Sequence, residues 1–248
     1  MQCYEWDYTL LTNDVDAFGR WRMDAVFRLM QEAAGAHSKL LGFSREALVR
    51  ERGMVWMIAR ARGEVLRCPG LYDTVRVLTW YGDAGKITFP RYFIVKDAPG
   101  REVAHISTAW TLVDLAQRRI VPPQRANLPF PPAAALAPPL PEPQKLRLKK
   151  EGTPRVILRA PLYGDIDVNR HMNNASYIGW ILDLFPLEWH ERRRVESIAI
   201  GYLSEAQPGE EVQLLLYEYG GEFEVQGLDP ADRHVVFEAQ GAWVPAGE

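Results

Sequence analysis

Apolar residues in the second half of the chain repeat with the spacing of one helix face. Four of them stand at i, i+3, i+4 and i+7, a spacing typical of an amphipathic helix: Ile178, Ile181, Leu182 and Phe185. Pro186 is expected to mark the end of this helix, because proline disrupts a helix interior. Asn173 or Asn174 is expected at the N-cap, where its side-chain oxygen can accept a hydrogen bond from a free backbone N–H group.

A second helical pattern occurs in the first half of the chain. Four apolar residues again fall on one face: Val26, Leu29, Met30 and Ala33. Asp24 precedes them and is expected to be the N-cap, and Gly42 is expected to stop the helix. The sequence thus predicts one principal helix in each half.

Segments rich in β-branched and aromatic residues follow each predicted helix. In the first half they are 54–67, 72–81, 86–96 and 102–113, and in the second half 195–204, 211–218, 222–228 and 234–244, with 155–162 before the second helix. The strand around Val75 and Val77 is expected to be buried on nearly both faces. Pro69-Gly70, Pro208-Gly209 and the segment 97–100 are expected to form turns.

The two halves repeat, and a proline-rich segment separates them. Residues 121–145 hold nine of the 18 prolines, so this segment cannot supply the donors of a sheet. Asp14-Val-Asp16 before the first helix corresponds to Asp165-Ile-Asp167 before the second. This pattern predicts domain duplication, with an N-terminal domain at 1–120, a linker at 121–150 and a C-terminal domain at 151–248.

Composition narrows the functional classes. Hydrophobic content of 47% and charged content of 25% are typical of a soluble globular protein. The net charge of −3 argues against nucleic-acid binding, and no apolar run is long enough for a membrane helix. The N-terminus has no signal-peptide pattern and the cysteines have no metal-type spacing, so a cytoplasmic location is expected.

Polar residues gather directly before the second helix. The stretch from Tyr163 to Asn174 contains two carboxylates, a histidine and three carboxamides: Asp165, Asp167, His171, Asn169, Asn173 and Asn174. A helix N-terminus supplies free N–H groups and a partial positive charge, which can stabilise a developing oxyanion. A base and oriented amides beside those donors could hydrolyse an acyl group. The first half has Phe18, Arg20 and Arg22 at the matching positions, so we expect chemistry in the second half only.

Asp167 is the base that the residues favour, either by activating water or by attacking a carbonyl itself. The alternative is an aspartate that only braces the turn. His171 could act as a base, an acid or an orienting partner, whereas His37, His105, His190 and His234 are expected to be structural. A metal site at Asp165, Asp167 and His171 is disfavoured because the amides would have no role in it.

The stretch Asp165-Ile-Asp167-Val-Asn169-Arg-His171-Met-Asn173-Asn174, continued by Tyr177-Ile-Gly-Trp-Ile-Leu, resembles the signature of plant and bacterial acyl-[acyl-carrier-protein] thioesterases. The resemblance covers most of the chain. It implies an α+β fold of two tandem hot-dog domains, each a long helix wrapped by an antiparallel sheet. It also implies hydrolysis of fatty acyl thioesters on acyl carrier protein, without a cofactor or metal.

The resemblance assigns catalytic roles to Asp167, Asn169, His171 and Glu205. Asn173 and Asn174 are expected to contact substrate or to cap the helix. Many plant members carry cysteine directly after the glutamate, where this chain has Ala206. That departure removes a papain-type cysteine mechanism here, and neither Cys3 nor Cys68 aligns with the position.

Two other functions remain open from the sequence. One is hydrolysis of acyl-CoA, and the other is non-catalytic binding of acyl thioesters. Because acyl carrier proteins are acidic, a basic docking cluster is expected, either Arg147, Lys149 and Lys150 or Arg192 to Arg194. Acyl chain length and saturation preference, and whether the chain forms a homodimer, cannot be read from the sequence.

Overall fold

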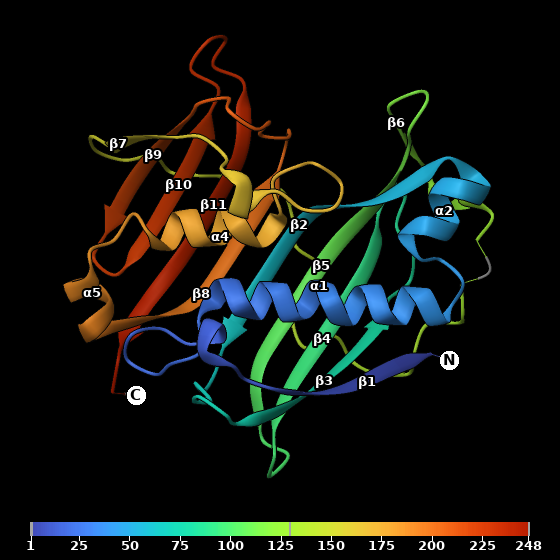
Figure 1. Cartoon of the computed structure of the whole chain (residues 1–248), viewed down its shortest axis with the longest axis horizontal. Coiled ribbons are helices and arrows are strands. Elements are labelled where there is room, and N and C mark those ends of the chain that lie inside the picture. Colours follow the sequence, from blue (N-terminus) through green and yellow to red (C-terminus); the bar gives the residue numbers. More distant parts are fainter. Residues whose placement is uncertain (1, 129, 248) are drawn as a thin grey trace. The chain divides into compact units, whose positions relative to one another are not determined.

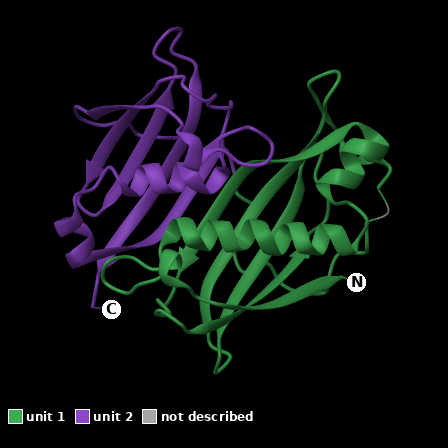
Figure 2. Cartoon of the chain, viewed as in Figure 1, with its two compact units in different colours: residues 1–143 green, residues 144–248 purple. Residues whose placement is uncertain are grey.

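The computed structural model describes residues 2–128 and 130–247. The chain forms two compact units, residues 1–143 and residues 144–248 (Figure 2). Each unit consists of an antiparallel sheet with one principal helix running along it (Figure 1).

The first unit contains six strands: β1 (Cys3–Thr9), β2 (Met54–Val65), β3 (Thr74–Tyr81), β4 (Phe89–Asp97), β5 (Glu102–Asp114) and β6 (Arg119–Val121). Their order is β1-β3-β4-β5-β2, with β6 paired to β5. Helix α1 (Met23–Leu40) lies across this sheet (Figure 1), and Val26, Leu29, Met30 and Ala33 are buried, as predicted. Phe27 of α1 lies over Gly63 of β2, where a side chain would come within 3.0 Å of its ring.

The second unit repeats this plan with five strands: β7 (Arg155–Arg159), β8 (Arg193–Tyr202), β9 (Val212–Tyr219), β10 (Glu222–Leu228) and β11 (Val235–Pro245). Their order is β8-β11-β10-β9-β7. Helix α4 (Asn174–Leu182) buries Tyr177, Ile178, Trp180 and Ile181, and the Tyr177 and Phe237 rings pack edge to face at 5.2 Å. The two units confirm the expected α+β pair of hot-dog domains.

Most predicted strands are present within a few residues of their expected ends, but β1, β6 and two short helices of the first unit were not predicted. Strand β1 was missed because Cys3–Thr9 has no fully buried residue and gives a weak alternating pattern. The short helix α2 (Arg45–Arg52) was missed although Ser44 caps it and Gly53 ends it in the left-handed region at φ 62°. Ser44 and Gly53 are typical cap residues and could have predicted both ends of α2 from the sequence.

The predicted cap of α1 is wrong. The helix begins at Met23 with Arg22 at its N-cap, and Asp24 lies within the first turn. The buried Asp24 carboxylate binds Arg22 and Arg28 at 2.9 and 2.6 Å, so it forms ion pairs at the positive end of the helix instead of capping it.

The predicted end of the second helix is also wrong. Helix α4 ends at Leu182, and Pro186 is the N-cap of another helix, α5 (Leu187–Arg192). Phe185 remains buried after the helix has ended, because its ring packs against Phe223 and Trp243 of the sheet at 5.3 and 4.8 Å. The apolar periodicity therefore extends beyond the helix itself.

The proline-rich segment packs against the first unit. It contains the short helix α3 (Pro123–Ala126), and the ring of Phe130 lies 5.0 Å from those of Phe43, Tyr81 and Phe89. Glu142 accepts a hydrogen bond from Thr88 at 2.9 Å. The compact units divide after Pro143, whereas the expected domain limits at 120 and 151 remain a prediction.

No helix in the described part of the chain is long and apolar enough to cross a membrane.

Two glycines accommodate aromatic rings between β10 and β11. Phe223 pairs with Gly241, and Gly227 pairs with Phe237, so each ring lies over the backbone of the opposite strand. A Cβ on Gly227 would stand 2.3 Å from Phe237 Cε1, and one on Gly241 would stand 2.3 Å from Phe223 Cζ. These contacts hold the core residues of the second unit in register.

Substitution G227A is expected to destabilise the second unit by about 1–3 kcal/mol, because the new methyl group overlaps the Phe237 ring. Thermal unfolding followed by circular dichroism measures the effect. G35A is the control, because Gly35 is an exposed position of α1 with open space around it, and alanine should stabilise that helix by up to about 1 kcal/mol. An unchanged melting temperature for G227A would contradict the packing described.

Candidate active site

The polar stretch forms a tight loop that leads into α4, and aspartate carboxylates hold its backbone. Asp165 Oδ2 accepts a hydrogen bond from the Leu162 N–H at 2.9 Å, and the Asn173 N–H donates to the Asp165 carbonyl at 2.8 Å. Asp167 Oδ1 then accepts from the Asn169 N–H at 2.7 Å. The two carboxylates thus hold the loop backbone in its conformation without a ligand.

The first unit builds the same loop. Asp14 Oδ2 accepts from the Leu11 N–H at 2.8 Å, and Asp16 Oδ1 accepts from the Phe18 N–H at 2.9 Å. The Asp16 N–H donates to the Arg20 carbonyl at 2.8 Å, as the Asp167 N–H donates to the His171 carbonyl at 2.9 Å. The duplication therefore extends to individual backbone hydrogen bonds.

The two loops differ in the partners of their side chains. In the first, the Arg20 guanidinium binds Asp16 Oδ2 at 2.8 Å and closes the loop on itself. In the second, Asn169 Nδ2 donates to Asp167 Oδ2 at 3.1 Å, while His171 at the position of Arg20 pairs with Glu205. His171 Nδ1 lies 2.8 Å from Glu205 Oε1.

The predicted catalytic residues therefore come together as two pairs, Asp167 with Asn169 and His171 with Glu205. All four side chains are partly exposed, His171 to 42% and Glu205 to 35%, so water and a substrate can reach them. The Asp167 N–H, which donates to the His171 carbonyl at 2.9 Å, links the two pairs through the backbone. Their catalytic roles remain a prediction, because the geometry places the groups without showing a reaction.

Asn173 caps α4, as one of the two expected alternatives. Its Oδ1 accepts a hydrogen bond from the Ala175 N–H at 2.8 Å. Asn174 is the first helical residue, and its carbonyl accepts from the Tyr202 hydroxyl at 2.9 Å. The predicted contact of Asn173 and Asn174 with substrate stays a prediction.

Two tyrosines tie the end of β8 to α4, and the sequence had assigned no role to either. The Tyr177 hydroxyl accepts a hydrogen bond from the buried Ala206 N–H at 3.1 Å, directly after Glu205. The pKa of Tyr177 is raised to about 12, mainly because the phenol is buried. The phenol therefore stays neutral near neutral pH. Tyr202 is the second tie, through Asn174. The sequence feature that could have identified Tyr177 is a tyrosine on the apolar face of the helix, because a buried tyrosine hydroxyl needs a hydrogen-bond partner.

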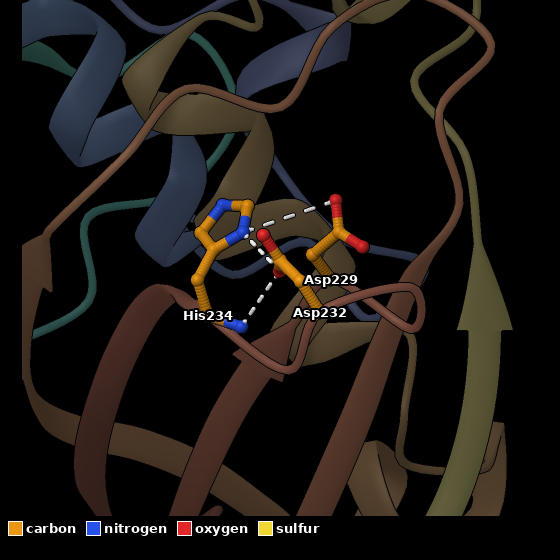
Figure 3. A group of neighbouring side chains, drawn as sticks. All are labelled: Asp229, Asp232 and His234. Atoms are coloured by element: carbon orange, nitrogen blue, oxygen red, sulfur yellow. Dashed lines mark hydrogen bonds and ion pairs between the residues drawn. The ribbon is translucent and has the colours of Figure 1, made fainter.

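Another group of potential metal ligands lies on the turn between β10 and β11 (Figure 3). Its members are Asp229, Asp232 and His234, whose ligand atoms lie within 4.8 Å of one another. His234 Nδ1 binds Asp232 at 2.7 Å, and Nε2 meets the Ser204 hydroxyl at 2.9 Å, so both ring nitrogens already have protein partners. The hydrogen bond to Asp232 raises the pKa of His234. We interpret the group as a brace of the turn, which agrees with the structural role expected for His234.

The fold defines a double hot-dog protein, and one of its two duplicated loops carries the Asp167–Asn169 and His171–Glu205 pairs. The acyl-ACP thioesterase N-terminal domain matches residues 1–124, and the acyl-ACP thioesterase C-terminal domain matches residues 154–237. The chain belongs to the acyl-ACP thioesterase family.

Named relatives agree with this assignment. The palmitoyl-acyl carrier protein thioesterase of Cuphea hookeriana is 29% identical over 210 residues, which are 80% of this chain and 51% of that protein. The oleoyl-acyl carrier protein thioesterase of Coriandrum sativum is 30% identical over 218 residues, which are 78% of this chain and 56% of that protein. The chain thus spans about half the length of the curated relatives it matches.

Two solved structures share the fold over nearly the whole chain. An acyl-ACP thioesterase from Bacteroides thetaiotaomicron superimposes with a TM-score of 0.86 at 23% identity, covering 98% of each chain. A 12:0-ACP thioesterase from Umbellularia californica gives a TM-score of 0.82 at 23% identity, covering 98% of this chain and 97% of that one.

Substitution Y177F is expected to lower stability by about 1–3 kcal/mol, because the buried Ala206 N–H loses its acceptor. Thermal unfolding measures the change. Y202F is the matched control and should lower stability less. The Asn174 carbonyl that loses the Tyr202 hydroxyl lies in the first turn of α4, where it also accepts a hydrogen bond from the helix backbone. Equal losses for the two variants would show that the Ala206 N–H is not the group that matters.

Proposed function

We propose that this protein is an acyl-ACP thioesterase, which hydrolyses a fatty acyl thioester to free fatty acid and holo-acyl carrier protein. Family membership and the activities named for the relatives support this function. The observation that carries it is the difference between the duplicated loops. The first closes on itself through Arg20 and Asp16, whereas the second presents the Asp167–Asn169 and His171–Glu205 pairs.

The route that we propose uses water and protein groups. Asp167 takes a proton from water, the water oxygen bonds to the carbonyl carbon, and the thioester C–S bond breaks. The leaving sulfur takes a proton from Nε2 of the charged His171, while Nδ1–H remains bonded to Glu205. The proton on Asp167 then returns to His171 through solvent, so the cycle closes. Direct attack by Asp167 through a mixed anhydride is the alternative that the residues leave open.

Asn169 and Glu205 have positioning tasks in this scheme. Asn169 holds both Asp167 oxygens, one through its backbone N–H and the other through its amide. Glu205 fixes the orientation of the His171 ring, as an acid does for histidine in hydrolase triads. Neither task requires a metal or an organic cofactor.

Thiol chemistry has little support. Ala206 occupies the position after Glu205, and the two cysteines, Cys3 and Cys68, lie in the first unit. Partial burial is the main cause that raises the pKa of Cys3, which makes its thiol less reactive. A water or carboxylate mechanism is therefore the one we retain.

Hydrolysis of acyl-CoA on the same scaffold is the second candidate, and matched acyl-ACP and acyl-CoA substrates of graded length separate the two. A non-catalytic acyl-thioester binding protein is the third, and it predicts no turnover of either. A cytoplasmic location remains a prediction, and homodimer formation remains open.

Substitution D167N is expected to lower kcat by about a hundredfold or more, the scale of losing a positioned base. The assay is hydrolysis of acyl-ACP by the purified protein. D16N is the matched control from the duplicated loop and should change activity little, because in the described part of the chain Asp16 pairs within its own loop. Comparable losses in the two variants would rule out a single site in the second unit.

The two basic clusters that could dock the acidic carrier differ in their acidic neighbours. In the first cluster, Lys149 Nζ lies 4.0 Å from Glu222, and Lys150 Nζ lies 3.6 Å from Glu238. The charges of these two lysines are therefore partly offset. In the second cluster, Arg192 is exposed at the end of α5. We propose that the cluster of Arg192 to Arg194 docks the carrier.

Substitution R192E is expected to raise KM for acyl-ACP several-fold with kcat little changed, because surface charge acts mainly on the encounter. The effect should fade as salt is added. A small acyl thioester without the carrier should be unaffected, and K149E is the control in the other cluster. If neither variant alters KM or its salt dependence, the carrier docks elsewhere or is not the partner.

A further inference from the structure

Arg170 lies in a strained backbone conformation within the loop. Its φ of +64° falls in the left-handed region, where a residue with a side chain costs about 1–2 kcal/mol. The duplicated loop has Gly19 at this position, with φ +76° and the matching hydrogen bond from its N–H group to the Asp16 carbonyl. Glycine therefore meets the backbone requirement of this turn without the strain.

No contact of the Arg170 side chain within the described part of the chain offsets this strain. The side chain is exposed, and among the described residues its guanidinium has no hydrogen-bond or ion-pair partner. Arg20, one position further along the duplicated loop, instead pairs with Asp16. The Arg170 guanidinium is therefore available to a ligand from outside the chain.

Strain alone does not assign a role, because Arg118 and Lys150 also have positive φ. The surroundings distinguish Arg170. It directly precedes His171, and it is the only lysine or arginine between residues 160 and 191. The carboxylates of Asp165, Asp167 and Glu205 belong to the same loop or lie beside it, so a cation here offsets their repulsion of an approaching anion.

The substrate of the proposed function carries such an anion. A thioester on acyl carrier protein is attached through a pantetheine arm that ends in a phosphate, and coenzyme A has the same arm. A guanidinium is always charged, and its planar set of donors matches the oxygens of phosphate. We propose that Arg170 binds the phosphate of the pantetheine arm and thereby helps to hold the thioester at the other end of the arm in the site. This inference rests on the proposed function.

The test compares two substrates that differ by one phosphate, an acyl-4′-phosphopantetheine and the acyl-pantetheine with the same acyl chain. R170Q should raise KM for the phosphorylated substrate about three- to tenfold with kcat within about twofold, the scale of one exposed charge-assisted contact. KM for acyl-pantetheine should not change. R170K should retain part of the effect, because it keeps the charge but loses the planar donors.

Two glycine variants separate binding from backbone strain. R170G should raise the melting temperature, because it relieves the left-handed strain, and should raise KM for the phosphorylated substrate as R170Q does. R118G is the matched control, since Arg118 is also an exposed arginine, with φ +51°, but lies between β5 and β6 of the first unit. It should leave KM unchanged for both substrates.

The outcomes distinguish this proposal from the proposed function. If the parent hydrolyses thioesters but R170Q changes KM equally for both substrates, or for neither, the phosphate contact is wrong and the proposed function stands. An effect on acyl-ACP that is absent from acyl-CoA and acyl-phosphopantetheine would point to carboxylates of the carrier and would also overturn the proposal. No turnover of any thioester by the parent would overturn the proposed function itself.

Discussion

The backbone-binding aspartates before each principal helix are the constraint on which the site depends. Asp165 accepts from the Leu162 N–H, and its own carbonyl accepts from the N–H of Asn173, the cap of α4. Asp14 makes the equivalent bonds to Leu11 and Arg22 before α1. A loop without regular structure would leave these backbone groups to water and would have no fixed shape. The carboxylate supplies the missing acceptor, and the side chains that follow it acquire fixed directions.

This arrangement explains how one duplicated backbone can have two functions. The backbone bonds of the loops agree within about 0.2 Å, and the difference lies in the side chains that they carry. Arg20 satisfies Asp16 within the first loop, which leaves a closed structural turn. Replacing arginine by histidine at position 171 shortens the side chain and directs it to Glu205 on another segment. A change at one position thus turns an internal ion pair into a contact between elements.

Much of the fold followed from the sequence because it depends on local patterns. Alternation of apolar residues gave most of the strands, and Asn173 was one of two expected caps because its side chain can bind the backbone nearby. The errors arose where tertiary contacts decide. Asp24 was drawn into ion pairs with two arginines, and Phe185 stayed buried through packing on the sheet after its helix had ended.

The proximity of most candidate site residues was predictable, but their pairing was not. Five of the six lie within ten positions of the sequence, whereas Glu205 is distant and was named only through the family resemblance. Its place beside His171 depends on Tyr177, which reaches from the buried face of α4 to the Ala206 N–H, and on Tyr202, which binds the first turn of the same helix. These are long-range contacts that no local pattern encodes. The histidine–glutamate pair is therefore a product of how the sheet packs on the helix, and disturbing that packing should move the pair even when every residue of the loop is intact.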